Sequence, residues 1–265
     1  MSERALSPVA LGALGQAMRW LPAAVVFTAL LVMAEAWVAG GGAPMTLPRP
    51  SGVLALLWRE HASLLHQLGT TVLTAGLGFV LALLLALAIG FTVYAWPRTE
   101  TPVLTAGAVL SSVPMIAIAP ILSVWLGLSI GTRVLITVVI CVFPLLVSVV
   151  QGLREHKATE QELFTVLAAS PWQRFRLLAL PSAVPLLFVG LKIAAPLAVL
   201  GALIGEWNGA ETGLGVVMLN AMFGLQVQRL WATVLIACAV SSLAYAYICL
   251  LEKVAGFDRS SPEAA

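Results

Sequence analysis

Side chains that could take part in acid–base, ligand or ion chemistry are few in this sequence, and they crowd into one part of it. Of the 26 charged residues (14 basic plus 12 acidic), nine fall between residues 151 and 206. They are Arg154, Glu155, Lys157, Glu160, Glu162, Arg174, Arg176, Lys192 and Glu206. Membrane enzymes such as lipid phosphatases need paired aspartates or clustered histidines, whereas the single aspartate here is Asp258 in the tail. We therefore expect no catalytic residue and no enzyme activity, and we interpret these charges as contact residues.

Metal and cofactor sites are not expected either. His61 and His66 have no third ligand at a useful spacing, which favours a polar interfacial face over a metal site. The three cysteines, Cys141, Cys238 and Cys249, lie in apolar stretches, where a thiol acts as a small hydrophobe. The sequence also contains no Gly-x4-Gly-Lys-Ser/Thr loop, the motif that cradles ATP phosphates. Any ATP-driven step must therefore use another chain.

The composition determines the class of protein that must position these charges. Of the 265 residues, 60% are hydrophobic and 10% are charged. Soluble chains are about 45–50% apolar and about 25% charged. A mean hydropathy of +1.01 and a net charge of +2 exclude a soluble enzyme, a disordered chain and a nucleic-acid-binding protein. The sequence predicts an all-α integral membrane protein that contacts lipids and forms a single transmembrane domain over residues 1–265.

Gaps between the charges predict about six transmembrane helices, because a helix needs roughly 20 apolar residues to cross the hydrocarbon. Four gaps hold no charge, at residues 61–97, 101–132, 134–153 and 230–251. Two more hold one each: residues 20–40 contain Glu35, and residues 177–205 contain Lys192. The first of the six could instead be a cleaved signal peptide. The bias of basic residues, nine against four with Lys192 set aside, places both termini in the cytoplasm.

Three segments lie between the spans. Residues 40–66 read as a turn followed by an amphipathic helix on the outer face. Residues 151–182 predict two short cytoplasmic helices at about 159–180, the first capped by Thr159 and the second by Ser170 before Pro171. Residues 206–229 form a Gly-rich outer segment with a short helix at 216–225. The two cytoplasmic helices would form a knob that fits a groove in a partner.

Prolines interrupt three of the spans. Pro114 and Pro120 lie in the third span, Pro144 in the fourth, and Pro185 and Pro196 in the fifth. Each removes a helix hydrogen bond and bends the helix. Membrane helices contain proline more often than soluble ones, but bent helices also line translocation paths. We favour the second interpretation.

The polar segment resembles the coupling motif of the binding-protein-dependent ABC importer permeases. That motif runs Glu-Ala-Ala, three residues, Gly, nine residues, Ile, one residue, Leu-Pro. Here Glu162 opens the frame, Ala168 stands in place of Gly, and Leu180-Pro181 closes it. Leu163-Phe164 replaces Ala-Ala. Alanine at the Gly position predicts a turn that does not need a positive φ.

Other stretches are similar to the nitrate, sulfonate and taurine branch of that family. They are Ser112-Val113-Pro114, Ala119-Pro120, Trp125-Leu126-Gly127-Leu128, Gly131, Phe143-Pro144, Gly190-Leu191-Lys192-Ile193-Ala194, Gly205-Glu206-Trp207-Asn208-Gly209-Ala210 and Gly213-Leu214-Gly215. The sequence around Glu206 is most similar to that of the permeases for thiamine-precursor pyrimidines (hydroxymethylpyrimidine). The resemblance covers about residues 65–255.

The resemblance implies a type I importer permease fold in a bacterial inner membrane. It implies a homodimer of permease subunits on two cytoplasmic ABC ATPases, fed by an extracytoplasmic solute-binding protein. ATPase closure would drive alternating access and move a small polar or heteroaromatic solute. Sulfonate, taurine or nitrate stay open as substrates.

The resemblance also gives the individual residues their expected roles. Glu162, Ala168, Arg174, Arg176, Leu180 and Pro181 are the expected ATPase-coupling residues, although capping and positive-inside charge also explain Glu162 and the two arginines. Pro114, Pro120, Pro144, Lys192, Glu206, Asn208 and Glu211 are the expected path or substrate-entrance residues. Lys192 could equally snorkel or form a structural pair. Glu206 and Glu211 could lie in a solvated loop.

A proton- or sodium-coupled secondary transporter is the rival from another class. It would need carboxylates at mid-membrane, and the second, third and fourth spans contain none.

Overall fold

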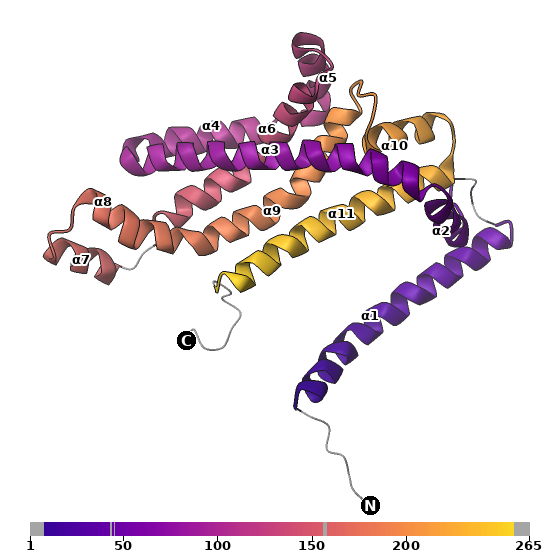
Figure 1. The fold of residues 1–265 in the computed structure, drawn as a ribbon, viewed down its shortest axis with the longest axis horizontal. Helices are drawn as coiled ribbons and strands as arrows, with labels where there is room; N and C mark the ends of the chain where they lie inside the picture. The colour runs from indigo at the N-terminus through magenta and orange to yellow at the C-terminus, as the bar shows by residue number, and fades with distance from the viewer. Residues whose placement is uncertain (1–7, 43, 45, 156–157, 257–265) are drawn as a thin grey trace, which may run out of the picture.

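The computed structural model describes residues 8–42, 44, 46–155 and 158–256, and its regular structure there is entirely helical (Figure 1). The α-helices are α1 (Pro8–Ala39), α2 (Pro50–Arg59), α3 (His61–Ala95), α4 (Glu100–Ser112), α5 (Met115–Leu126), α6 (Ile130–Gly152), α7 (Ala158–Val166), α8 (Pro171–Arg174), α9 (Leu180–Glu206), α10 (Leu214–Phe223) and α11 (Val227–Val254). Two short turns complete it: η1 (Pro97–Thr99, 3-10) and η2 (Phe175–Ala179, π). Asp258 and the chain ends lie outside the described residues.

The core is a bundle of three long helices, α3, α6 and α9, with α11 packed on α9 and α4 on α6. Small side chains let these helices approach closely: Ala82, Ala86, Ala194 and Ala202 are all fully buried. A Cβ added to Gly201 would lie 2.8 Å from Cα of Thr137, so only glycine fits that crossing of α6 and α9. Close approach of this kind is how helices associate in lipid, where no hydrophobic effect drives them together.

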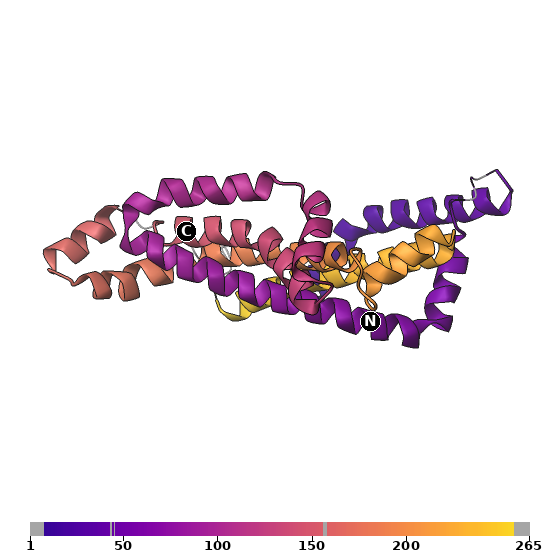
Figure 2. The same ribbon diagram turned by 90° about the horizontal axis from the view of Figure 1, so that it is seen from above.

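The third expected span is broken. Helix α4 ends at Ser112, α5 begins at Met115, and the two segments meet at 91° (Figure 2). Pro114 is the cause, since it cannot continue the hydrogen-bond ladder and it holds Val113 in an extended conformation (φ −76°, ψ 125°). Pro120 and Pro144 lie inside α5 and α6 without ending them.

By length and composition, four described helices could each cross a membrane, and the bent pair could supply a fifth. The four are α3, α6, α9 together with the turns before it, and α11. Five of the six expected spans therefore have counterparts among the described helices. The first expected span falls on α1, whose side chains are described without a gap from Val25 to Ala39, an apolar stretch that runs to the end of the helix. The side chains of the earlier part of α1 lie outside the described residues.

The outer amphipathic helix is shorter than predicted. It ends at Arg59, and His61 already begins α3, so His66 belongs to that long helix. Glu35 of α1 explains where α2 begins, because its carboxylate accepts hydrogen bonds from the backbone N–H and the hydroxyl of Ser51 (3.0 and 2.7 Å). The short helix expected at 216–225 is confirmed as α10, which begins and ends two residues earlier.

Candidate functional site

The two short polar helices α7 and α8 lie at one end of the bundle, opposite the end that carries α2 and α10 (Figure 1). The predicted Ser170 cap is confirmed: its hydroxyl accepts from the backbone N–H of Gln173, and the Gln173 side chain accepts from the Ser170 N–H. The Thr159 cap is wrong, because α7 already begins at Ala158.

The second coupling helix is not a separate element, contrary to the prediction. Helix α8 runs through the π turn η2 into α9, which makes one continuous helix, Pro171–Glu206, of 36 residues. Aromatic packing holds the turn: the ring of Phe175 lies 5.2–5.6 Å from those of Phe91, Tyr94 and Trp172. A π turn places one extra residue in a helix, and such turns are frequent at functional sites. Contacts with Phe175 thus attach the start of the fifth span to the end of α3.

The turn between α7 and α8 also differs from its prediction. Ala168 has a φ of +47°, so the turn needs the left-handed conformation that glycine adopts easily and alanine does not. The hydrogen bonds from the backbone N–H groups of Ala168 and Ala169 to the carbonyls of Thr165 and Phe164 close the end of α7 over this residue (3.0 Å each). Ala168 therefore satisfies the geometry of the family's glycine at a cost in backbone strain.

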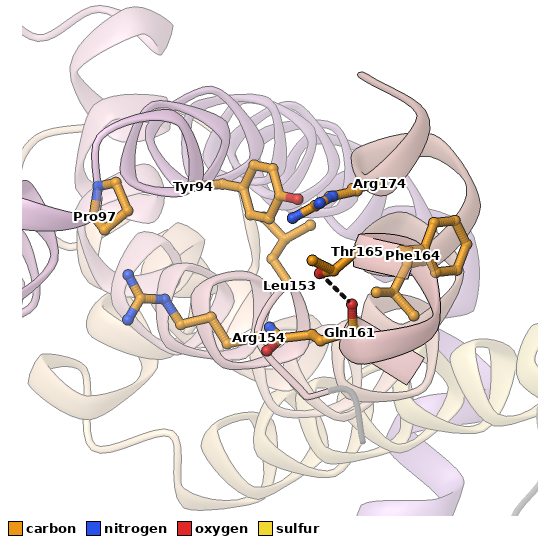
Figure 3. A pocket seen from close by; sticks show the side chains of 9 residues that line it. Tyr94, Pro97, Leu153, Arg154, Gln161, Phe164, Thr165 and Arg174 are labelled. Carbon is orange, nitrogen blue, oxygen red and sulfur yellow. Dashed lines mark hydrogen bonds between the residues drawn. The ribbon is translucent and has the colours of Figure 1, made fainter. Parts of the chain in front are cut away.

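A cavity of about 570 Å³ lies between this hairpin and the ends of α3 and α6 (Figure 3). Its lining residues are Tyr94, Pro97, Leu153, Arg154, Gln161, Phe164, Thr165, Arg174 and Leu178. The Nε of Arg174 donates to the carbonyl of Ala169 at 3.2 Å, and Arg154 forms an ion pair with Glu100 of α4. Figure 3 shows Arg174 beside the hydroxyl of Tyr94 and Arg154 on the other side of the opening.

The remaining coupling candidates face outward. Glu162 and Arg176 are exposed, and so are Leu180 and Pro181 at the start of α9. Three apolar side chains of this segment are exposed as well: Leu163 (56%), Val166 (83%) and Leu167 (65%). An exposed apolar cluster of this kind marks a surface that another molecule covers.

At the opposite end, Glu206 is buried with 1% of its surface exposed, so it does not lie in a solvated loop. Its Oε2 accepts from the backbone N–H of Gly215 (2.7 Å) and from the hydroxyl of Thr71 (3.1 Å). Thr71 accepts in turn from the N–H of Leu214 (2.9 Å), and the Gln67 side chain accepts from the N–H of Gly213 (2.7 Å). These four bonds cap the N-terminus of α10 with side chains of α3 and α9, an arrangement that we call the outer latch.

The other outer candidates are separated from one another. Asn208 donates to the carbonyl of Ile204 (2.7 Å) just beyond the end of α9, whereas Glu211 is exposed. Lys192 lies 14 residues before Glu206 on α9 and forms an ion pair with Glu252 of α11 at 2.5 Å. That contact is the structural pair considered for Lys192 from the sequence.

A second cavity, of about 590 Å³, lies at the break in the third span, and of the three expected path prolines only Pro144 lines it. Val113 and Met115, on either side of Pro114, line it together with Pro144 of α6. The full lining is Leu110, Ser111, Val113, Met115, Ile116, Val139, Ile140, Pro144, Leu197, Leu200 and Ile204. Pro120 is exposed on α5 and does not line it.

Sequence reasoning missed Tyr94, Gln67 and Thr71. Each lies inside an apolar span and can be recognised as a site residue by a partner far away in the sequence. Thr71 and Glu206, for example, are 135 residues apart. A polar side chain within a span is the one local signal that could have drawn attention to them. Among the described residues, no group of three His, Cys, Asp or Glu side chains could hold a metal ion.

A helical bundle with a broken span and a protruding polar hairpin, without an ATP-binding loop, defines a transport permease subunit. Residues 78–254 match the family described as "Binding-protein-dependent transport system inner membrane component", and the chain belongs to that family. It is an ABC importer permease with the type I fold, not an ion-coupled secondary transporter.

Curated relatives agree with this family. The chain is 32% identical to the formylaminopyrimidine transport permease ThiX of Halalkalibacterium halodurans, over 86% of this chain and 92% of ThiX. It is 32% identical to the riboflavin transport system permease RibX of Chloroflexus aurantiacus, over 83% and 81% of the two chains. It is 27% identical to the putative aliphatic sulfonates permease SsuC of Bacillus subtilis, over 78% and 76%.

Proposed function

We propose that this permease moves a small, neutral heteroaromatic solute of the thiamine-precursor pyrimidine class into a bacterial cell. The observation that carries the proposal is the cavity at the broken span. Its eleven lining residues include no charged side chain, and Ser111 has the single hydroxyl among them. A flat ring with few hydrogen-bonding groups fits an apolar lining, in which a few placed polar groups set the orientation.

The same cavity argues against a sulfonate, taurine or nitrate. A permanent anion loses its hydration in an apolar site unless a cation or several donors replace it, at a cost of several kcal/mol. Neither Lys192 nor Arg133 lines the cavity. ThiX and RibX, both named for heteroaromatic compounds, support the same choice.

Orientation and assembly belong to the proposal. Both termini lie in the cytoplasm, and the α7–α8 hairpin faces two ABC ATPases while the outer latch faces the solute-binding protein. Two copies pair through the bent helices α4 and α5. No residue of α4 is buried in the single chain. Val109 of α4 and Val124 and Trp125 of α5 are 63–83% exposed. Lipids cover the remaining apolar surface.

Residue roles follow from this arrangement. Glu162, Arg176, Leu180 and Pro181 meet the ATPase, Ala168 shapes the turn, and Arg174 braces it. Pro114, Pro120 and Pro144 shape the path. Glu206 and Asn208 hold the outer ends of their helices, Glu211 meets the incoming binding protein, and Lys192 fixes α9 to α11. The permease itself has no catalytic step, and ATP closure in the partners drives alternating access.

The substrate is tested by finding the cognate binding protein and measuring which ligands raise its melting temperature. A pyrimidine should raise it and an alkyl sulfonate should not; the reverse result contradicts the proposal. In the permease, Met115→Trp fills the cavity and should block solute uptake in proteoliposomes. Leu243→Trp on α11 is the matched control, because Leu243 is 67% exposed and lies neither in the cavity lining nor on the α4–α5 face proposed for pairing.

Coupling is tested by the double substitution Leu163→Ser with Val166→Ser, which removes the apolar contacts of α7. Co-purification of the ATPase should fall at least tenfold, roughly the effect of losing 1.4 kcal/mol or more of binding energy. Val254→Ser, at the exposed end of α11, is the control. Unchanged co-purification of the double variant would remove α7 from the ATPase interface.

A further inference from the structure

We infer that the cavity beneath the α7–α8 hairpin is a binding site for the phosphate headgroup of an anionic phospholipid. The inference rests on the membrane placement given in the proposed function, which puts this cavity at the inner face. It does not depend on the solute or on the ATPase. The contacts, the charge and the level of the cavity each support it.

The lining is basic, with Arg154 and Arg174 and no acidic residue among its nine members, and Glu100 outside it pairs with Arg154. The guanidinium of Arg174 therefore supplies most of the net positive charge. Arg174 is fixed by its Nε bond to the Ala169 carbonyl, which leaves the Nη end of the guanidinium beside the Tyr94 hydroxyl (Figure 3). Arg154 is fixed at the other side by its ion pair with Glu100. Guanidinium groups held in place bind phosphate oxygens at a low entropic cost.

The shape of the lining suits a lipid. Tyr94, Gln161 and Thr165 add hydrogen-bonding groups around the opening, while Leu153, Phe164 and Leu178 supply an apolar wall. A volume of about 570 Å³ accommodates a glycerophosphate headgroup. A phospholipid presents a phosphate followed by an apolar tail, so it matches a lining that combines polar and apolar side chains.

The level of the cavity is that of a membrane interface. It lies where α3 and α6 end and the fifth span begins. Trp96 lies two residues after Tyr94, and Trp172 lies two residues before Arg174. These two tryptophans are 64% and 62% exposed. Exposed tryptophans typically lie at the headgroup level, and basic pockets between spans on the cytoplasmic side bind anionic headgroups.

The test is a lipid titration of the purified full-length chain, followed by native mass spectrometry, without ATPase, nucleotide or solute. Phosphatidylglycerol is compared with phosphatidylethanolamine of identical acyl chains, and glycerol 3-phosphate is the soluble competitor. We expect tighter binding of phosphatidylglycerol and no displacement by glycerol 3-phosphate. Arg174→Gln should weaken phosphatidylglycerol binding about fivefold, the effect of one basic residue near an anionic headgroup.

Three variants separate this result from misfolding. Arg174→Lys should restore most of the affinity, and Tyr94→Phe, which removes one hydroxyl, should weaken it about threefold. Arg59→Gln makes the same charge change on an exposed residue at the opposite end and should have no effect. Equal binding of the two lipids, or equal weakening by Arg59→Gln, overturns the inference. Displacement by glycerol 3-phosphate assigns the cavity to a soluble anion and overturns it too.

Failure of this inference is distinguishable from failure of the proposed function. If Arg174→Gln abolishes ATPase co-purification but leaves lipid binding unchanged, the cavity belongs to the ATPase interface and the inference is wrong, while the transport proposal stands. If lipid binding behaves as expected but no pyrimidine binds the cognate binding protein, the substrate proposal fails alone.

Discussion

The two ends of this permease are held in opposite ways. At the end that carries α10, the buried Glu206 and Thr71 and the partly buried Gln67 bind the first backbone N–H groups of that helix within one chain, and Oε1 of Glu206 has no hydrogen-bond partner among the described residues. At the coupling end, α7 exposes Leu163, Val166 and Leu167. A buried polar network specifies one arrangement, because any other leaves polar groups unpaired. The exposed apolar cluster leaves α7 incomplete within the single chain, in keeping with the ATPase contact proposed for it.

The contrast predicts which property of the protein a substitution at each end will change. Substitutions in the outer latch should alter the stability of the isolated chain, whereas those on α7 should alter assembly and leave stability nearly unchanged. The following predictions test that division.

The largest effect is expected for Gly213→Ala. Gly213 has a φ of +130°, and a Cβ there would overlap the Glu206 carboxylate. Strain and overpacking together should lower the free energy of unfolding by about 4 kcal/mol. Thermal melting in detergent measures it. Gly69→Ala is the control, since nothing lies within 4 Å of the added Cβ. Similar melting of the two variants would contradict the latch.

Glu206→Ala comes second. It removes the acceptor for the Gly215 N–H and the nearer of two acceptors for the Thr71 hydroxyl, which still reaches the Gln67 carbonyl at 3.4 Å, so the cost should be about 2 kcal/mol. Glu206→Gln keeps one carbonyl oxygen and should cost about 1 kcal/mol. Hydrogen exchange at residues 213–217 should accelerate in the alanine variant. If exchange there is unchanged, α10 is held by something else.

Lys192→Met tests the ion pair nearer the coupling end. It leaves the Glu252 carboxylate without its cation, which should lower stability by about 1.5 kcal/mol, less than for a fully buried pair because both side chains keep some exposure. The double variant Lys192→Met with Glu252→Gln should recover most of the loss. Transport by the double variant close to that of the native chain would confirm a structural role; loss of transport despite recovered stability would assign Lys192 to the path.

The smallest effect is expected for Ala168→Gly, and its sign is opposite. Glycine relieves the left-handed strain at φ +47° but adds freedom to the unfolded chain, so the net gain should be about 0.5 kcal/mol. Hydrogen exchange over residues 163–170 should slow. Ala169→Gly, beside it and without a positive φ, should do the reverse. Faster exchange in Ala168→Gly would contradict the strain at this turn.

Local features were predictable from the sequence and distant partners were not. Ser170 before Pro171 encodes a cap within four residues, and Pro114 breaks its span through its own ring. The hydrogen bonding of buried Glu206 depends on Thr71, 135 residues earlier. The ion pair of Lys192 depends on Glu252, which lies on another helix. An alanine at position 168 does not indicate a positive φ from its residue type. The positive φ accompanies the hydrogen bonds that close the end of α7.

The spans follow the same division. Long charge-free stretches predicted α3, α6 and α11 because apolar length alone defines them. The fifth span was expected to begin after a separate coupling helix. Nothing in residues 171–181 announces a π turn, since the aromatic rings that hold Phe175 come from α3 as well as from α8. The merging of α8 with α9 therefore required the tertiary structure.

That merging gives the molecule a mechanical link. From Pro171 to Glu206 the chain is one continuous helix of 36 residues, about 54 Å along its axis at 1.5 Å per residue. It begins in the hairpin and ends at the Glu206 carboxylate that binds the N-terminus of α10. A movement of the hairpin would therefore be transmitted to the other end through one helix, with no loop between them. The π turn, Pro185 and Pro196 are the points where that helix can bend.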